Sequence, residues 1–351
     1  MQMQYNNSVI FVGWIRVGKP ADCGETMKNQ LLISRLEKLG VNVRKMDFKD
    51  WRKHPWVILQ LLWNMLVHRK DTLIFSTSTQ NVYSLMKAMK TIRWQQNTVH
   101  WVIGGALGNK VAKGIYRTDV VGYMRHTLVE SRLMKDQLDS MGIKNVKVVP
   151  NFKPIPYYPT LSAKRKDTKV KFVFLSRIMP DKGCDYIIDA ARLLNEEGRL
   201  SQYSVDFYGA IANEYQEVFE NKIKLLPNVN YQGFLNLREN KGYDTLAQYD
   251  VMLFPTYWRG EGFAGVFIDA FICGLPMIIT DWAHNRAFMD EDETAMFVPV
   301  HDVVALKDKM RDCIEGKYDL NTMAQNCQRH AKRFNVDNVV TIELLKEIEI
   351  I

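Results

Sequence analysis

Cysteine is scarce in this sequence, and the few cysteines form no motif. The 351 residues include five cysteines, and none of them stands in a CxxC pair or next to a histidine cluster. Scattered thiols of this kind are typical of a protein in a reducing compartment, and they favour neither a disulfide framework nor a zinc site. We therefore predict reduced, structural cysteines and no disulfide bond.

Long hydrophobic runs are also missing. The most apolar segment, residues 56–67, is interrupted by Gln60 and Asn64, and it is shorter than the roughly 20 residues that cross a bilayer as a helix. The N-terminus has no basic stretch ahead of its short apolar run and no small-residue cleavage site, so it does not resemble a signal peptide. We expect a cytoplasmic protein, either free or bound peripherally at the cytoplasmic face of a membrane.

Several motifs of cofactor, metal and nucleic-acid binding are absent. No G-x-G-x-x-G follows the first apolar segment, as a nicotinamide dehydrogenase would need, and no Walker loop is present. The acids at 290–293 are consecutive, and a run of adjacent acids does not converge on one ion. We predict no metal site and no cofactor. We also find no zinc-finger, RNA-recognition or helix-turn-helix motif.

Charge is distributed unevenly along the chain. Residues 1–150 hold 23 Lys and Arg against 10 Asp and Glu, a formal charge of +13, whereas the remainder holds 24 against 29, which is −5. A basic half can face nucleic acid, an anionic membrane or a phosphorylated acceptor, or it can be a solvated surface without a partner. The charge alone leaves these alternatives open.

Short apolar segments alternate with amphipathic ones along the chain, which indicates parallel βα units with helices on both faces of a sheet. Prolines at 154, 156 and 159, followed by a charged stretch, mark a boundary. We predict a first domain over 1–155, a linker over 156–168, a second domain over 169–330 and a C-terminal helix over 331–351.

The stretch 250–276 carries the most informative pattern. Val251–Phe254 reads as a buried strand that ends at a proline, and Glu261 follows in the loop. The loop continues as Gly262-Phe263-Ala264-Gly265 into a short helix, where two glycines let an anionic group approach free backbone N–H groups. Asp269 adds a second carboxylate. This arrangement suits a ligand that has both phosphates and hydroxyls.

These residues resemble the retaining family-4 glycosyltransferases (glycosyltransferases group 1) of the GT-B architecture. That family has E-G-F, an acid eight residues after the first Glu, and then G-x-P; this sequence has Glu261-Gly262-Phe263, Asp269 and Gly274-Leu275-Pro276. The family's second acid is usually Glu, so Asp269 is one methylene shorter. The resemblance implies an α/β fold of two Rossmann-like, doubly wound domains that face a central cleft. It further implies that Glu261 binds hydroxyls of the donor sugar, that the amides of Gly262, Phe263 and Ala264 bind the sugar and diphosphate, and that Asp269 binds the ribose.

The segment from Ser176 to Gly183 matches a second family pattern, G/S-R-x4-K-G, through Arg177 and Lys182. The resemblance implies that both cations hold the donor's diphosphate. Charge that builds on a leaving diphosphate is stabilised by fixed cations and a helix N-terminus. Relatives bind the base by main-chain groups after a later strand, so Gly233 and Phe234 are weaker candidates for base contact.

In the first domain the resemblance implies loops that approach the phosphates and the acceptor. Gly18 and Gly24 lie in the first such loop, although a plain βα turn explains them almost as well. Gly104 and Gly105 end a later strand, where ligands bind in open α/β sheets. Relatives place a histidine near this loop; His100 lies inside the strand instead, and His126 is the other candidate. Both are more often structural than catalytic.

Residues 51–70 read as a helix that is apolar nearly all round. Gln60, Asn64 and His68 form one narrow polar stripe, and basic pairs stand at both ends. Tryptophan, the residue favoured at membrane interfaces, occurs three times. We expect a core helix, because interfacial helices usually have a wide charged face; a membrane-surface helix is the alternative.

The sequence therefore predicts a retaining, metal-independent hexosyltransferase that moves a sugar from a nucleotide-sugar donor to a glycan acceptor. The basic first domain would present the acceptor, and its apolar helix favours a lipid-linked glycan of cell-surface polysaccharide assembly. Two alternatives remain. One is a nucleotide-sugar epimerase or a phosphorylase of the same fold, and the other is a non-enzymatic nucleic-acid-binding protein. We expect a nucleotide sugar and a glycan as partners, an anionic membrane as a further one, and no nucleic acid.

Overall fold

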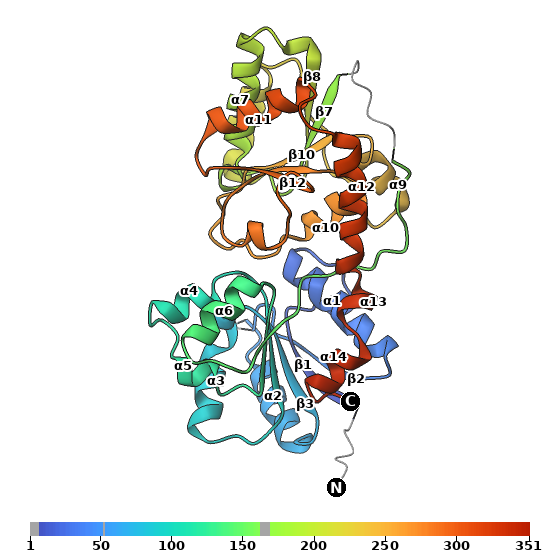
Figure 1. Cartoon of the computed structure of the whole chain (residues 1–351). Helices are drawn as coiled ribbons and strands as arrows, with labels where there is room; N and C mark the ends of the chain where they lie inside the picture. Colours follow the sequence, from blue (N-terminus) through green and yellow to red (C-terminus); the bar gives the residue numbers. More distant parts are fainter. Residues whose placement is uncertain (1–6, 52, 162–168) are drawn as a thin grey trace. The chain divides into compact units, whose positions relative to one another are not determined.

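The computed structural model describes residues 7–51, 53–161 and 169–351. These residues form two compact α/β units (Figure 1). The first unit comprises Met1–Pro154, Gly262–Gly265 and Arg333–Ile351, and the second comprises Ile155–Glu261 and Val266–Lys332. The chain first passes between the units one residue before the predicted boundary at 155. Part of the predicted linker, residues 162–168, lies outside the described residues.

The first unit is built on a parallel sheet of six described strands in the order β2-β1-β3-β4-β5-β6. The strands are β1 (Ser8–Gly13), β2 (Asn42–Asp47), β3 (Thr72–Thr77), β4 (Thr98–Val102), β5 (His126–Val129) and β6 (Val146–Val148). The helices are α1 (Gly24–Lys38), α2 (Trp56–Val67), α3 (Thr79–Thr91), α4 (Leu107–Ala112), α5 (Thr118–Val121), α6 (Arg132–Ser140), α13 (Val336–Val339) and α14 (Ile342–Glu347).

Strand β1 shows why this sheet is central to its unit. Residues 9–12 are all fully buried, as expected of a parallel strand that is covered on both faces. Val9 and Phe11 point to the face packed by α1, α13 and α14, whereas Ile10 and Val12 point to the face packed by α2 and α3. Successive side chains of this strand therefore pack alternately into two separate hydrophobic cores.

The second unit has its own parallel sheet of six described strands, in the order β12-β11-β10-β7-β8-β9. The strands are β7 (Val170–Leu175), β8 (Tyr203–Tyr208), β9 (Val229–Tyr231), β10 (Val251–Phe254), β11 (Met277–Thr280) and β12 (Ala295–Val298). The helices are α7 (Cys184–Glu196), α8 (Gln216–Ile223), α9 (Asn240–Leu246), α10 (Gly265–Ile272), α11 (Val303–Ile314) and α12 (Leu320–Ala331).

The end of the chain differs from the single helix predicted over 331–351. Arg333–Ile351 belongs to the first unit and forms two short helices, α13 and α14. Asn335 caps α13, the backbone leaves helical geometry at Val340, and Thr341 caps α14. Each of the two helices therefore begins at its own side-chain cap, and the prediction of one helix is wrong.

Helix α2 also differs from the expected core helix. Only Leu61 and Met65 of its 12 residues are buried. They pack against the core beneath β1 and β3. The opposite side of the helix is exposed, so the prediction of a helix enclosed by the core is wrong for most of its surface.

Candidate functional site

The second sheet reverses its direction of growth between β7 and β10, which pair in parallel. Strands β8 and β9 extend the sheet on one side, and β11 and β12 extend it on the other. In open α/β sheets ligands bind beyond the carboxyl ends of the strands at such a switch point. The loops that follow β7 and β10 carry Lys182 and Glu261, so the sequence places both predicted residues at the point where this topology binds ligands.

Lys182 and Glu261 form a direct ion pair. Lys182 Nζ lies 2.5 Å from Glu261 Oε2, and the side chains are 13% and 7% exposed. The hydroxyl of the fully buried Thr256 also donates to Glu261 Oε2, at 2.9 Å. The Lys182 ammonium lies over the ring of Phe254, 5.3 Å from its centroid. Both charges are thus largely removed from water and are held by each other and by the end of β10.

Gly183 explains how the two loops come so close. It has φ +81°, and a Cβ atom there would lie 2.2 Å from the carbonyl oxygen of Pro255. Only glycine fits this backbone geometry and this spacing. The predicted glycine of the second family pattern therefore has a steric reason that is independent of any ligand.

Arg177, the other predicted cation, follows β7 directly and is exposed. The next residue, Ile178, is buried and forms a bridge with Ile211. This bridge fixes the backbone beside Arg177 while its side chain faces solvent. The structure brings Lys182 and Glu261 together, whereas Arg177 stays at the surface of the same loop.

Asp269 lies in α10 and is 4% exposed. It accepts a hydrogen bond of 2.9 Å from the hydroxyl of Tyr243, a residue that the sequence did not single out. Burial and the carboxylate of Asp269 raise the pKa of Tyr243, which keeps its proton and its role as donor. The predicted contact of Asp269 with ribose stays a prediction.

Gly233 and Phe234, the candidates for base contact, follow β9. Gly233 has φ +77°, and its carbonyl accepts a hydrogen bond from the N–H of Gly209 at 2.8 Å. Phe234 is 81% exposed. An exposed aromatic ring can stack on a base, so this prediction is compatible with the geometry.

The first unit contains a second buried ion pair that sequence reasoning missed. Lys28 Nζ of α1 lies 2.6 Å from Glu130 Oε1 at the end of β5, and the side chains are 4% and 5% exposed. Glu130 Oε2 also accepts a hydrogen bond of 3.1 Å from the N–H of Phe263. A lysine within the buried stripe of a helix, on the same side as Leu32, is the signal that could have indicated a partner.

Phe263 is anchored within the first unit by three further features. Its carbonyl accepts from Asn151 Nδ2 at 2.9 Å, its ring meets Phe334 edge to face at 4.7 Å, and it is 4% exposed. The sequence predicted that its amide binds a ligand, but in this structure that N–H is bonded to Glu130. Ala264 is half-buried and precedes α10.

The glycine loop after β4 meets the same segment. A Cβ on Gly262 would lie 3.0 Å from the nitrogen of Gly105 and 3.1 Å from the Cα of Gly104. It would also lie 2.7 Å from Glu130 Oε2. The predicted residues Gly104, Gly105 and Gly262 are therefore in close contact, and glycine at 262 is needed for that contact.

The structure also places the remaining candidates of the first unit. His100 is fully buried within β4, and burial lowers its pKa to about 4, so the ring is neutral and no ligand reaches it. This removes His100 from the candidate site. Burial also lowers the pKa of His126. Gly18 has φ +70° in a turn, and Gly24 begins α1, where a Cβ would meet no atom.

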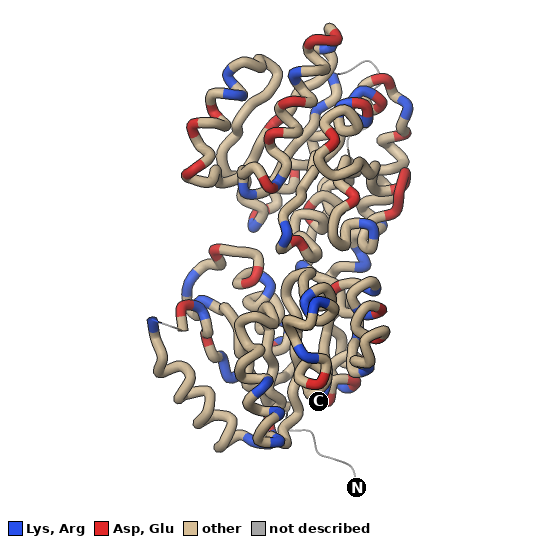
Figure 2. Tube along the Cα trace, turned by 90° about the vertical axis from the view of Figure 1, so that its left-hand side faces the viewer, with Lys and Arg blue, Asp and Glu red and all other residues tan. Residues whose placement is uncertain are grey.

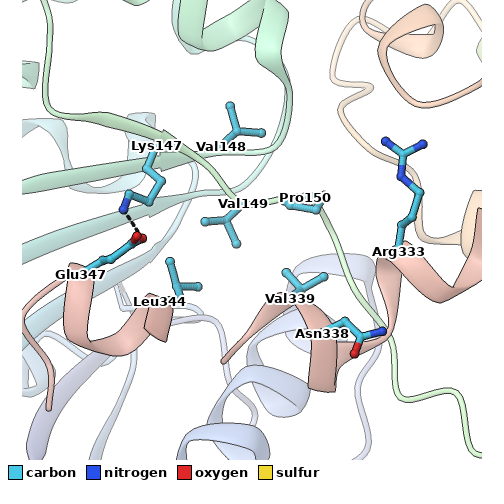
Figure 3. A pocket seen from close by; sticks show the side chains of 9 residues that line it. All are labelled: Lys147, Val148, Val149, Pro150, Arg333, Asn338, Val339, Leu344 and Glu347. Atoms are coloured by element: carbon cyan, nitrogen blue, oxygen red, sulfur yellow. Dashed lines mark hydrogen bonds and ion pairs between the residues drawn. The ribbon is translucent and has the colours of Figure 1, made fainter. Parts of the chain in front are cut away.

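The first unit also has an open pocket of about 430 Å³ that contains none of the predicted residues. Figure 3 shows Lys147 and Glu347 paired across one end of it, while Arg333 points away from that pair. The floor is formed by Val148, Val149, Val339 and Leu344. One acid and one base that neutralise each other beside an aliphatic surface give this pocket no evident catalytic group.

No group of three or more metal-binding side chains is found in the part of the chain that the structure describes. All five cysteines lie in that part; four are buried, Cys23 is half-buried, and none is joined in a disulfide. Burial raises the pKa of Cys184 and Cys313 to about 12, so these two thiols are not nucleophiles near neutral pH.

Comparisons with known proteins agree with this geometry. Residues 162–334 match the family described as glycosyl transferases group 1. A curated relative, the poly(ribitol-phosphate) alpha-N-acetylglucosaminyltransferase of Staphylococcus aureus (strain COL), is 22% identical over 187 residues, which are 52% of this chain and 35% of that protein. The match thus spans about a third of the relative's length.

Two solved structures show the fold of the whole chain. HepE from Anabaena, solved in complex with UDP, is similar at a TM-score of 0.71 and 17% identity, covering 97% of this chain and 100% of that one. Sucrose-phosphate synthase from Thermosynechococcus elongatus reaches a TM-score of 0.75 at 12% identity, covering 97% and 98%. The fold is the two-domain α/β architecture GT-B. Residues 162–334, just under half of the chain, match the glycosyl transferases of group 1, and they include both Lys182 and Glu261.

Proposed function

We propose that the protein is a retaining glycosyltransferase that moves a hexose from a nucleotide sugar to a glycan acceptor in the assembly of a cell-surface polysaccharide. The observation that carries the proposal is the Lys182–Glu261 pair at the β7/β10 switch point. It joins the two family patterns of the sequence at the place where this topology binds ligands. We also propose that the reaction takes place in the cytoplasm.

The Lys182–Glu261 ion pair suggests what changes when a donor binds. Without a ligand, Lys182 and Glu261 neutralise each other, which avoids an isolated charge in a largely buried place. A bound diphosphate would give Lys182 a new anionic partner and would release Glu261 to accept hydrogen bonds from sugar hydroxyls. Arg177, exposed in the same loop, is free to turn towards the phosphates.

The transfer itself breaks the bond between the sugar's anomeric carbon and the phosphate oxygen, and it forms a bond from that carbon to the acceptor oxygen. The acceptor's proton goes to the leaving diphosphate, whose new negative charge Lys182 and Arg177 stabilise. No protein nucleophile is needed in this scheme. The sugar keeps its anomeric configuration, which can be read from the NMR spectrum of the product.

A thermal-shift panel of UDP, GDP, ADP, CDP and dTDP tests the donor site. A ligand at 100 times its Kd stabilises the folded state by about 2.7 kcal/mol, so one nucleotide should raise the Tm well above the others. UDP is tried first, because HepE was solved with UDP. If none of the five changes the Tm, no nucleotide site exists and the proposal fails.

The acceptor is tested with radiolabelled nucleotide sugar. Label that appears in a lipid extract supports a lipid-linked glycan. Label on a soluble sugar phosphate would instead favour a product of the kind that the name sucrose-phosphate synthase gives. A nucleotide sugar that is converted without any transfer of label would identify an epimerase.

A further inference from the structure

Helix α2 exposes an apolar surface that its own unit does not cover. The exposed apolar side chains are 40% or more accessible, and together they form what we call the α2 patch: Trp56 (72%), Leu59 (55%), Leu62 (43%), Trp63 (67%), Leu66 (55%) and Val67 (54%). They recur at helical spacing, so they share one side of the helix, opposite Leu61 and Met65. Gln60 is the one exposed polar residue within the helix. Monomeric soluble proteins rarely expose contiguous apolar patches of this kind without a function.

Basic residues stand at both ends of the patch. Figure 2 shows α2 without a red or blue residue along its length and with blue at each end. Lys53 is 77% exposed before the helix, and Arg69 and Lys70 are exposed after it. Arg69 lies over the ring of Trp94, 4.6 Å from its centroid. Residues 51–70 contain no acid, so the surface combines an apolar centre with positive ends.

We propose that the α2 patch and its basic ends bind an anionic lipid membrane, with α2 lying parallel to the membrane surface. An interfacial helix buries its apolar face at the boundary of headgroups and acyl chains, and tryptophan is favoured at that depth. Basic side chains at the helix ends reach anionic headgroups. The helix of 12 residues is about 18 Å long. Among the described residues, no helix has the length and apolar character to cross a bilayer.

Charge distinguishes a membrane from a second copy of the chain as the occupant. In a symmetric dimer through α2, the same surface would face itself. If the two helices ran antiparallel, Lys53 of one copy would meet Arg69 and Lys70 of the other, and if they ran parallel, like ends would meet. Asp50, whose carboxylate lies 3.8 Å from Lys53 Nζ, partly offsets the charge at one end, whereas Asp71 beyond the other end is buried. An anionic membrane matches the apolar centre and the basic ends at once.

Flotation of the full chain with vesicles tests the proposal. One set of vesicles is phosphatidylcholine with 30% phosphatidylglycerol, and the other is phosphatidylcholine alone. The wild type should float with the anionic set and much less with the neutral one. Trp56→Gln combined with Trp63→Gln should weaken binding at least tenfold. Lys53→Gln combined with Lys70→Gln should weaken it about 25-fold at low salt, since each basic residue near the surface contributes about fivefold.

Matched controls come from exposed residues outside the patch. Leu225, 81% exposed in the second unit, and Ile92, 65% exposed in the first, provide the apolar control as Leu225→Gln with Ile92→Gln. Lys113 and Lys144, both exposed in the first unit, provide the charge control as Lys113→Gln with Lys144→Gln. These variants should float like the wild type. Because all substituted side chains are exposed, every variant should keep the wild-type Tm.

Three results would overturn the proposal: no flotation of the wild type, equal flotation on neutral and anionic vesicles, or wild-type flotation by the tryptophan double variant. Light scattering after gel filtration tests the alternative, in which a second copy of the chain binds the α2 patch. A wild-type dimer that the tryptophan double variant converts to a monomer would assign the patch to a second copy. The readout involves no sugar donor, so it stands or falls independently of the proposed transfer reaction.

Discussion

Among the residues that the structure describes, each unit contains one strongly buried lysine–glutamate pair, and the two pairs differ in position. Lys182–Glu261 lies at the switch point of its sheet, where the loops after β7 and β10 meet. Lys28–Glu130 joins helix α1 to the end of β5, whereas the first sheet reverses between β1 and β3. Both pairs are therefore buried, but only Lys182–Glu261 lies at the switch point of its sheet.

Their hydrogen-bond partners differ as well. Glu261 accepts from a side-chain hydroxyl, that of Thr256, whereas Glu130 accepts from a backbone amide, that of Phe263. A carboxylate that holds a backbone N–H fixes a loop. We infer that Lys28–Glu130 mainly stabilises the fold and positions the Gly262–Phe263 segment, while Lys182–Glu261 serves the ligand.

The largest expected effect is on transfer through Lys182. Lys182→Met should lower kcat/KM at least 100-fold, because removing one group that stabilises developing charge typically costs 10²–10³ in rate. Arg177→Ala should act in the same direction. The measurement is the rate of sugar transfer at a temperature where all variants are fully folded. Wild-type turnover in Lys182→Met would show that the pair does not serve the reaction.

Lys222 offers a matched control in the same unit. Its Nζ lies 2.5 Å from Asp185 Oδ1, but the side chains are 42% and 28% exposed. Exposed ion pairs contribute little, and Lys222 lies in α8 and belongs to neither motif, while its partner Asp185 lies in the first turn of α7. Lys222→Met should therefore stay within about twofold of the wild type in transfer.

The second effect concerns stability and the first unit. Glu130→Gln leaves the Lys28 ammonium buried without a countercharge, which should lower the free energy of unfolding by about 3–5 kcal/mol. For a unit of this size that corresponds to a fall in Tm of roughly 6–20 °C, measured by calorimetry. The double variant Lys28→Met with Glu130→Gln should recover most of the loss. A Glu130→Gln protein that melts like the wild type would contradict the structural role.

A third substitution separates the charge of Glu130 from its contact with Phe263. Glutamine keeps an acceptor for the Phe263 N–H, whereas alanine does not. Under the proposed function, Glu130→Ala should raise the KM for the donor more than Glu130→Gln does. Equal KM values for the two variants would show that the bond to Phe263 does not position the segment.

The sequence predicts a structural feature well where neighbouring residues cause it, and poorly where a distant residue does. The apolar runs of residues 170–175 and 251–254 predict two buried strands, and β7 and β10 have these bounds, because buried parallel strands need unbroken apolar runs. The apolar run of residues 9–17 predicts a first strand that reaches Val17, but β1 ends at Gly13, because the N–H groups of Ile15 and Arg16 donate to the carboxylate of Asp47. That partner lies more than 30 residues away and has no local sequence pattern.

The buried ion pairs show the same difference between residues that the sequence predicts and residues that it does not. Lys182 and Glu261 stand in motifs, so the sequence could name both, and the β7/β10 pairing then brings them together. Lys28 and Glu130 are 102 positions apart and belong to no motif, so their contact could not be predicted. The exposed side of α2 was only the alternative to a core helix for another reason: its apolar residues look the same in sequence whether a core or a membrane covers them.

The smallest expected effect tests the switch point of the first sheet, the counterpart of the place that Lys182 and Glu261 occupy in the second. Glu25 of α1 accepts a hydrogen bond from the hydroxyl of Thr77, at the end of β3, at 2.6 Å, and burial raises the pKa of its carboxyl to about 7. In the unfolded chain this pKa is about 4.5. Between these values the folded state binds more protons than the unfolded state, so stability falls as the pH rises from about 4.5 to about 7.

Glu25→Gln cannot ionise, and its amide oxygen can still accept from Thr77, so it should remove this part of the pH dependence. At pH 8 the variant should be more stable than the wild type by about 1–2 kcal/mol, less than the full shift implies because the carboxyl is only partly buried. At pH 4.5 the two should melt alike. Glu37→Gln, an exposed acid on the same helix, is the control and should leave the profile unchanged. If Glu25→Gln also follows the wild-type profile, Glu25 does not titrate in the folded state, and the first switch point carries no ionisable group comparable to Glu261.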